Sequence, residues 1–270
     1  MPEAHQAFVG SVPANYDRYL GPLIFEDYAR DLAERIARAD PRALLETAAG
    51  TGIVTRHLRR LLGDTIALTV TDLNPDMLAY AQQQLGPLSN ARFETADAQA
   101  LPLPDAAFDA LACQFGFMFF PDKAKAFAEA ARVLRPGGLL VFNVWDSLEH
   151  NHLVDTVVGA LTELLGDGPP RFFATPFGWY ALDPMKALLE DAGFDELGFA
   201  VLPRPCVAAS AEAVARGFIQ GSPFAAELGQ RSPVPVEEAV ARVTRAVAAA
   251  HGEPPRGTRM QAITVTARRA

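Results

Sequence analysis

The stretch LLETAAGTGIVTRHL, residues 44–58, decides the fold because it contains a strand, a tight turn and the start of a helix in succession. Residues 44–47 form a short run suited to a buried strand, and residues 51–62 are predicted to form a helix. The turn between them, AAGTG, consists of small residues. Turns of this kind at the start of a helix usually hold the anionic part of a nucleotide cofactor.

Strands and helices alternate along the rest of the chain. Alternation of this kind gives parallel βαβ units, so the sequence predicts an α/β, Rossmann-like, doubly wound sheet. The predicted strands are 44–47, 65–72, 91–97, 107–115, 138–145, 196–202 and 260–268, with RPGG (135–138) as a turn before the fifth. The predicted helices are 24–38, 51–62, 74–85, 122–134, 152–165, 182–191 and most of 211–250, broken at GSPF and SPVP.

We expect a single domain over residues 1–270, because the irregular segments read as insertions around one sheet. The expected parts are a helical cap (1–40), a cofactor-binding core (41–146), two lid segments (147–181 and 208–256) and the last strand (257–270).

Composition excludes several classes of function. The net charge of −8 and the lack of a basic stripe argue against a nucleic-acid partner. The two cysteines, Cys113 and Cys206, lack metal-ligand spacing, so no metal is expected and an intracellular protein is the simpler reading. The first ten residues lack a signal-peptide pattern, and no apolar run is long enough to span a bilayer. We therefore expect a cytoplasmic protein without membrane insertion, and the sequence is compatible with a homodimer.

The glycine spacing distinguishes between two cofactors. A nicotinamide dinucleotide needs G-x-G-x-x-G, whose third glycine lets the pyrophosphate approach the helix. Gly50 and Gly52 match the first two glycines, but Thr55 occupies the third position, and starting at Ala48 leaves Ile53 there. S-adenosylmethionine has no pyrophosphate and fits such a turn. An NAD(P)-dependent oxidoreductase remains the alternative.

Residues at the ends of the predicted strands complete a cofactor site, because ligands of such sheets bind at the carboxyl ends of the strands. Asp72 lies 20 residues after Gly52 (72 − 52), the separation expected of an acid that binds the ribose hydroxyls. Leu73 and Met77 are placed to sandwich the adenine. Asp97 is placed to accept from the adenine amino group, with the Ala98 amide nearby.

Four motifs in order give a specific resemblance. LLETAAGTG, VTDLNPDML, ETADAQALPLPDAAFDAL and FAEAARVLRPGGLLVF resemble the class I S-adenosylmethionine-dependent methyltransferases, in the type 11 branch that includes ubiquinone and menaquinone C-methyltransferases. The resemblance implies a mostly parallel seven-stranded sheet with the last strand antiparallel, and Glu46 as the acidic residue of the first motif. NYDRYLGPLIFEDYA is similar to the family's cap over the cofactor. Ala48 departs from the pattern, since many members have glycine there.

The reaction expected is methyl transfer to a small-molecule acceptor by in-line displacement, with S-adenosylmethionine as cofactor. The aromatic segment GDGPPRFFATPFGWY favours an apolar or aromatic acceptor, and a non-enzymatic or repurposed binding protein is the second alternative. No catalytic base is assigned; the candidates are His150, His152 and Tyr16. Tyr16 and Tyr19 are expected to close the cofactor site, and Gln114 and Phe115 to border the methyl group.

Overall fold

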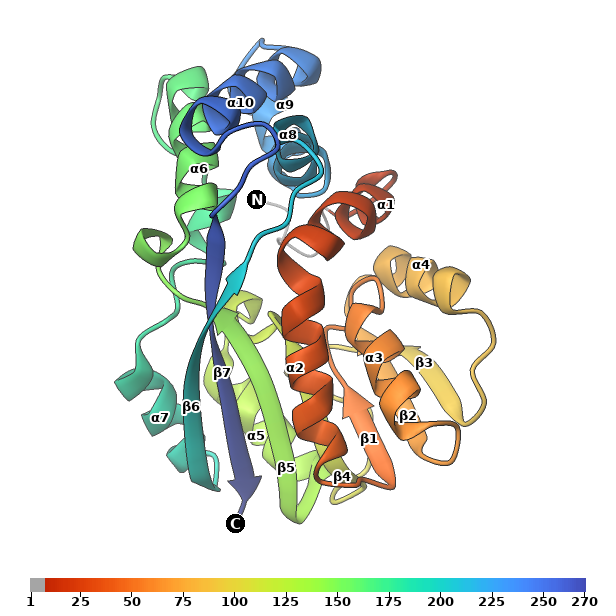
Figure 1. The fold of residues 1–270 in the computed structure, drawn as a ribbon. Coiled ribbons are helices and arrows are strands. Elements are labelled where there is room, and N and C mark those ends of the chain that lie inside the picture. The colour runs from red at the N-terminus through yellow and green to blue at the C-terminus, as the bar shows by residue number, and fades with distance from the viewer. Residues whose placement is uncertain (1–7) are drawn as a thin grey trace. The chain divides into compact units, whose positions relative to one another are not determined.

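The structure, a computed structural model, describes residues 8–270 and contains one mixed seven-stranded sheet within them (Figure 1). Its strand order is β3-β2-β1-β4-β5-β7-β6, and β7 runs antiparallel to β5. The predicted fold class is confirmed. The strands are β1 (Ala43–Glu46), β2 (Ala67–Asp72), β3 (Ala91–Thr95), β4 (Phe108–Gln114), β5 (Leu134–Trp145), β6 (Phe194–Pro205) and β7 (Arg259–Arg269).

The α-helices follow the predicted alternation. They are α1 (Val12–Asn15), α2 (Glu26–Ala37), α3 (Ile53–Leu62), α4 (Pro75–Leu85), α5 (Lys123–Val133), α6 (His152–Leu165), α7 (Leu182–Asp191), α8 (Ala211–Gln220), α9 (Phe224–Arg231) and α10 (Val236–His251). Figure 1 shows α2 and α3 on the near side of the sheet and α5 behind it. The predicted breaks at GSPF and SPVP separate α8, α9 and α10.

The chain divides into two compact units. Unit 2 comprises Tyr28–Trp145, Trp179–Leu202 and Ala262–Ala270 and contains most of the sheet. Unit 1 comprises the described part of Met1–Asp27, together with Asp146–Gly178 and Pro203–Gln261. These segments overlap with the predicted cap and lid segments. The assignment of all 270 residues to one domain stays a prediction.

One local prediction was wrong, and one helix begins later than predicted. RPGG does not turn the chain before the strand, because β5 already begins at Leu134 and passes through these residues. The register between β4 and β5 shifts between Phe108 and Ala110, so the segment is an irregularity within a strand and Gly137 takes a positive φ of 76°. The helix predicted over residues 24–38 is present as α2, but residues 24 and 25 belong to a π-helix, η2 (Tyr16–Phe25), whose i→i+5 pattern the four-residue apolar spacing does not reveal.

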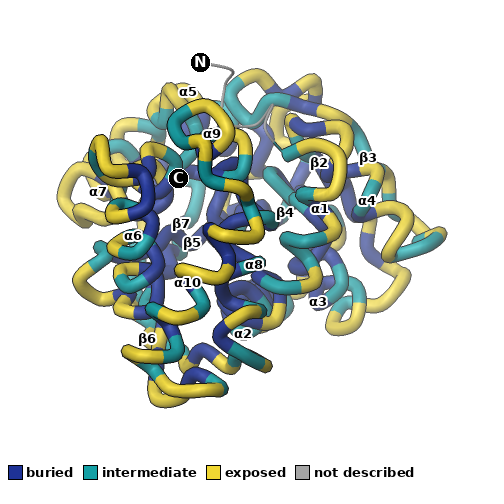
Figure 2. Tube along the Cα trace, turned by 90° about the horizontal axis from the view of Figure 1, so that it is seen from above, coloured by how far each residue is buried: buried dark blue, intermediate teal, exposed yellow. Residues whose placement is uncertain are grey.

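Buried side chains follow the central strands of unit 2, which are dark blue in Figure 2. Leu44 and Leu45 in β1, Ala112 in β4, and Val141 and Phe142 in β5 have no exposed surface. Strands that are covered on both faces read as continuous apolar runs, as β4 does here. Cys113 is a free, buried thiol whose pKa burial raises to about 12, so it behaves as a core residue.

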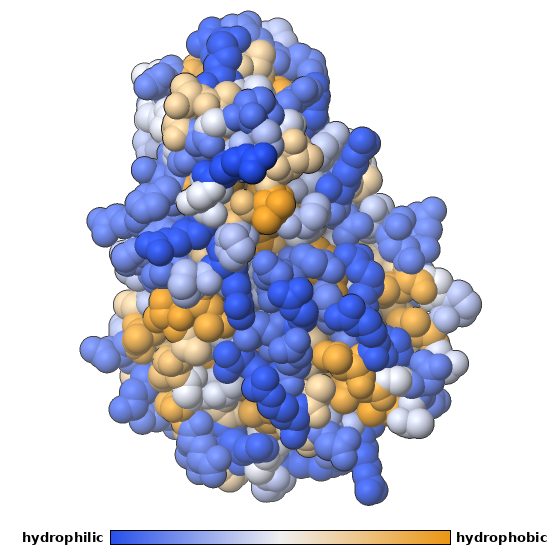
Figure 3. Space-filling view, viewed as in Figure 1, coloured by the Kyte–Doolittle hydropathy of each residue, from blue (hydrophilic) through white to orange (hydrophobic). Residues whose placement is uncertain are grey.

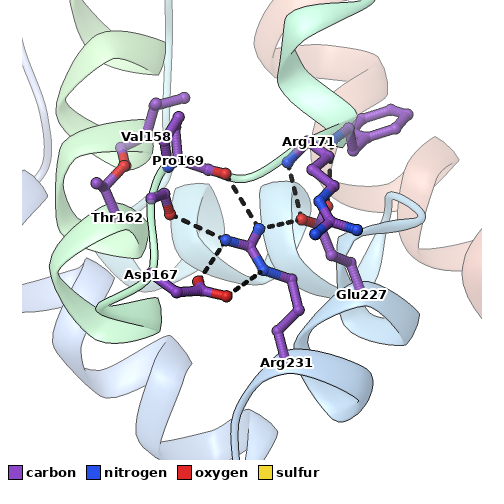
Figure 4. Close-up of polar contacts among 9 residues, drawn as sticks. Val158, Thr162, Asp167, Pro169, Arg171, Glu227 and Arg231 are labelled. Atoms are coloured by element: carbon purple, nitrogen blue, oxygen red, sulfur yellow. Dashed lines mark hydrogen bonds and ion pairs between the residues drawn. The ribbon is translucent and has the colours of Figure 1, made fainter.

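Unit 1 is mainly helical, and a half-buried arginine, Arg231, organises the loop after α6 (Figure 4). Arg231 of α9 pairs with Asp167 and Glu227 and also donates to the carbonyl oxygen of Pro169 at 3.0 Å. Glu227 accepts from the backbone amides of Arg171 and Phe172 at 2.8 and 3.1 Å. The aromatic segment predicted as a loop is therefore held by specific polar contacts.

The visible surface is mainly hydrophilic, with hydrophobic side chains in small separate groups (Figure 3). Within the described residues, no helix is long and apolar enough to cross a membrane.

Candidate functional site

The turn after β1 is built for close approach to the backbone. Ala48, Gly50 and Gly52 have φ values of 51°, 58° and 80°, in the left-handed region that favours glycine. At Gly52 the positive φ disfavours other residues, and a Cβ atom there would lie 2.9 Å from Leu85 Cδ1 and 3.2 Å from Ala81 Cβ. The Ala48 methyl group is accommodated because residue 116, across the sheet edge, is glycine. A Cβ on Gly116 would lie 2.6 Å from Ala48 Cβ.

Asp72, at the end of β2, fixes this turn. Its Oδ2 accepts from the Gly50 amide at 2.7 Å, and its Oδ1 accepts from the Asn74 amide at 2.8 Å. Met77, in the first turn of α4, is buried, and its Cε would be 3.6 Å from a Cβ on Gly50. The structure thus brings the β1 turn, Asp72 and Met77 together, as the sequence predicted.

Glu46 is almost completely buried beneath the turn, with 1% of its surface exposed. Burial raises the pKa of its carboxyl group from 4.5 to about 8, the charge of Asp72 adds to the rise, and a hydrogen bond from Thr55 opposes it. The Thr55 hydroxyl donates to Glu46 Oε2 at 2.7 Å. A carboxyl group with a raised pKa at a strand end is a recurrent feature of binding sites.

The loop after β3 lies beside the same edge, because the Ala96 amide donates to the carbonyl oxygen of Asp72 at 3.0 Å. Asp97 Oδ1 accepts from the Gln99 amide at 2.8 Å and from Gln99 Nε2 at 3.1 Å. Ala98 is half-buried, and Leu73 has 36% of its surface exposed. Exposed Leu73 and buried Met77 remain candidates for the two sides of an adenine.

The turn after β4 has the second unusual backbone of the site. Phe115 has φ 52°, which is strained for a bulky residue. Its amide donates to both the carbonyl oxygen and the side-chain Oδ1 of Asn143, each at 3.1 Å. Its ring stacks on Trp145 with centroids 3.8 Å apart, and Tyr28 meets Phe115 and Trp145 edge-on at 5.6 and 5.3 Å. Gln114 lies in register with Asn143 at the adjoining strand ends.

Other predicted site residues belong to unit 1. Tyr16 stacks on Phe25 at 4.8 Å, and the Arg18 guanidinium lies over the ring of Tyr19. His150 and His152 are exposed, next to and within the first turn of α6. Their roles, and the assignment of the cofactor-binding residues as a set, stay predictions.

Sequence reasoning missed residues that act through contacts. In the sequence, Thr55 marks only the position of the missing third glycine, yet its hydroxyl donates a hydrogen bond to Glu46. Gly116 makes room for Ala48, and Tyr28 completes the aromatic group. Asn143 could have been noticed in the sequence, because it is the one polar residue in the otherwise apolar run VFNVW. A polar residue in such a run indicates a required hydrogen bond.

The fold and this edge define a class of protein. β1 and β4 are neighbours, and the sheet order reverses between them, so the crevice for a nucleotide-type ligand lies at their carboxyl ends. Small residues in left-handed conformations, two acidic strand ends and no third glycine fit S-adenosylmethionine and the methyltransferases that use it.

The comparisons agree with this class. Residues 45–142 match the family described as "Methyltransferase domain". The ubiquinone/menaquinone biosynthesis C-methyltransferase UbiE of Shewanella halifaxensis is 31% identical over 206 residues, covering 70% of this chain and 82% of that protein. The demethylmenaquinone methyltransferase of Deinococcus radiodurans is 37% identical over 143 residues, covering 52% of this chain and 59% of that protein.

A solved structure supports the fold. The [4+2]-cyclase SpnF superposes with a TM-score of 0.58 at 21% identity, covering 99% of this chain and 97% of that one. The chain belongs to the class I S-adenosylmethionine-dependent methyltransferases of the UbiE type. It is an enzyme that transfers methyl groups with S-adenosylmethionine as cofactor, and the oxidoreductase alternative is not favoured.

Proposed function

We propose that the acceptor is a quinol-type small molecule and that the methyl group is transferred to a carbon atom of its ring. One observation in the structure carries this proposal: the stacked Phe115–Trp145 pair with Tyr28 beside it, at the carboxyl ends of β4 and β5. The three side chains are buried, with at most 5% of their surface exposed, and once an acceptor gains access to them, aromatic side chains pack favourably against a flat ring. The names of the two relatives, a ubiquinone/menaquinone C-methyltransferase and a demethylmenaquinone methyltransferase, support the same acceptor class.

The residues of unit 2 supply binding and orientation. Asp72 presents a carboxylate suited to ribose hydroxyls, and Asp97 one suited to an adenine amino group. Glu46, Ala48, Gly50 and Gly52 are proposed to receive the methionine end. When bound, S-adenosylmethionine supplies an electrophilic methyl group, so the protein needs chiefly to align the acceptor and exclude water.

Methylation at carbon requires a proton acceptor. A ring carbon that accepted the methyl group from bound S-adenosylmethionine, leaving S-adenosylhomocysteine, would carry one proton too many and would have to release it to a protein group. His150, His152 and Tyr16 remain the candidate bases. A further histidine, His251, lies near His152. Its pKa is lowered by partial burial and, to a smaller extent, by the charge of His152. The His251 ring shares a hydrogen bond with the Thr156 hydroxyl of α6.

The test is transfer of a trideuterated methyl group to a short-chain demethylmenaquinol, followed by mass spectrometry. We expect a product heavier by one trideuteromethyl group in place of a ring hydrogen, with one S-adenosylhomocysteine released per product. The control acceptor is the same quinol with its ring position already methylated, which gives no product. Transfer to oxygen, or none while S-adenosylhomocysteine binds, would overturn the proposal.

Location and assembly belong to the same proposal. We place the enzyme in the cytoplasm with small-molecule substrates and no nucleic-acid partner, in keeping with its net charge of −8. Self-association as a homodimer is testable by sedimentation of the purified chain.

A further inference from the structure

Three polar side chains lie at one level across the centre of the sheet in unit 2. Gln114 of β4 is in register with Asn143 of β5, and Asn143 is in register with Thr264 of β7. Side chains in register on neighbouring strands project from the same face of a sheet. We name Gln114, Asn143 and Thr264 the polar row.

Two atoms of the polar row lack hydrogen-bond partners within the described residues. They are Asn143 Nδ2 and Thr264 Oγ1, in residues that are 0% and 1% exposed. The side-chain amide of Asn143 has a fixed orientation, because its Oδ1 accepts a hydrogen bond from the backbone N–H of Phe115 at 3.1 Å. Buried polar atoms without partners are unfavourable, and where they occur side by side they call for a ligand or a water molecule.

The chemistry of these atoms defines what they can bind. Asn143 Nδ2 is a donor, and the Thr264 hydroxyl both donates and accepts. Together they complement a neutral oxygen, either a hydroxyl or a carbonyl. No lysine or arginine belongs to the row, so a carboxylate or phosphate would lack a counter-charge there.

The surroundings indicate what carries that oxygen. Trp145 lies two residues beyond Asn143 on β5, hence on the same face, and its ring stacks with Phe115. We propose that Asn143 and Thr264 form the subsite for a ring-oxygen substituent of the acceptor, beside the aromatic pair. This inference rests on the proposed function, because it deepens the assignment of a quinol-type acceptor.

Access to the polar row requires a local rearrangement, because both atoms are enclosed. Phe115 has a strained backbone, with φ 52°, and of the strained residues at this edge it is the one whose amide is bonded to Asn143. Residues held in sparsely populated conformations cluster at ligand clamps and switch regions. We therefore place the opening at Phe115.

The experiment compares two probes that differ in one oxygen, 1-naphthol and naphthalene. Their dissociation constants are measured by equilibrium dialysis against the full chain saturated with S-adenosylhomocysteine. The fluorescence of Trp145 is followed in a Trp179→Phe background as a local signal. The variants are Thr264→Val and Asn143→Leu, which keep approximate shape and remove the polar atoms.

The matched control is Thr266→Val. Thr266 lies on the same face of the same strand, two residues from Thr264, opposite Val141. The Thr264 hydroxyl has no partner to lose, so Thr264→Val should unfold at a temperature no lower than wild type. Unfolding therefore does not account for a loss of probe binding in that variant.

We expect wild type and Thr266→Val to bind 1-naphthol ~10-fold more tightly than naphthalene, and both row variants to lose this preference. Equal preference in wild type and Thr264→Val, or no preference in wild type, overturns the inference. The proposed function is judged separately by methyl transfer. Methylation of the quinol with an unchanged preference in the variants refutes the subsite alone, whereas a lost preference without methylation refutes the function alone.

Discussion

The turns that follow β1 and β4 resemble each other in backbone and differ in how their polar groups are paired. Each places a non-glycine residue in the left-handed region, Ala48 with φ 51° and Phe115 with φ 52°. They meet where the Ala48 methyl group packs towards Gly116. In the first turn, Asp72 and Thr55 already hold the Gly50 amide and Glu46. Beside the second, Asn143 Nδ2 and Thr264 Oγ1 have no partner among the described residues.

The two halves of the proposed site are therefore organised to different degrees. The cofactor half is organised before any ligand arrives, which reduces the ordering that binding requires. The proposed acceptor half has two polar atoms without a partner among the described residues and a strained phenylalanine beside them.

The first prediction concerns the buried carboxyl group of the cofactor half. Because the folded-state pKa of Glu46 is raised from 4.5 to about 8, the folded protein holds a proton there that the unfolded chain releases above pH 4.5. The stability associated with this proton is fully present below pH 4.5 and is lost as the pH rises to about 8. Glu46→Gln removes the titrating group, so the free energy of unfolding in urea should depend less on pH between these limits than it does in wild type. The expected difference is on the order of a few kcal/mol. Glu94→Gln, on β3, is the control, and a Glu46→Gln profile parallel to wild type would contradict the prediction.

The second concerns Asp72, whose carboxylate joins the turn and is proposed to bind the ribose. Asp72→Ala should weaken S-adenosylhomocysteine binding by ~100-fold, because charge-assisted hydrogen bonds are lost. Calorimetry measures the change. Asp76→Ala, an exposed acid four residues away, should leave the affinity within ~2-fold of wild type. Equal losses in both variants would show a general charge effect.

The third concerns the contact between the two turns. Gly116 has ordinary φ and ψ of −92° and −47°, so Gly116→Ala introduces no backbone strain, but its methyl group would lie 2.6 Å from Ala48 Cβ and Cys113 Sγ. Overpacking of this kind costs ~1–3 kcal/mol in unfolding free energy. Adding Ala48→Gly should recover part of the loss in a double-mutant cycle. Strict additivity would mean that the two turns are not coupled.

The smallest effect is expected for Ala48→Gly alone. Glycine relieves the strain at φ 51° but adds conformational entropy to the unfolded chain, so the two contributions oppose each other. We expect a stability change below ~1 kcal/mol and a change in S-adenosylhomocysteine affinity below ~3-fold. A gain of tenfold or more in affinity would show that the alanine narrows the turn.

The sequence predicted what depends on local pattern. Periodicity and spacing were enough to predict the alternation of strands and helices, the AAGTG turn and the position of Asp72 at a strand end. The π-helix Tyr16–Phe25 could not be predicted, since its hydrogen-bond pattern has no simple apolar period. Gly116 matters through its contact with Ala48, Thr55 through its hydrogen bond to Glu46, and Thr264 through its register with Asn143, and none of these pairings follows from a local pattern. The polar row follows from strand register, and register is fixed by the assembled sheet.

The measurement that tests the central claim most directly is calorimetric titration of the wild-type chain with S-adenosylhomocysteine, with NAD and NADP titrated in parallel. We predict one site for S-adenosylhomocysteine and no heat of binding for either nicotinamide cofactor. Binding of NAD or NADP, or a folded protein that binds none of the three, would contradict the assignment of the turn after β1 to S-adenosylmethionine.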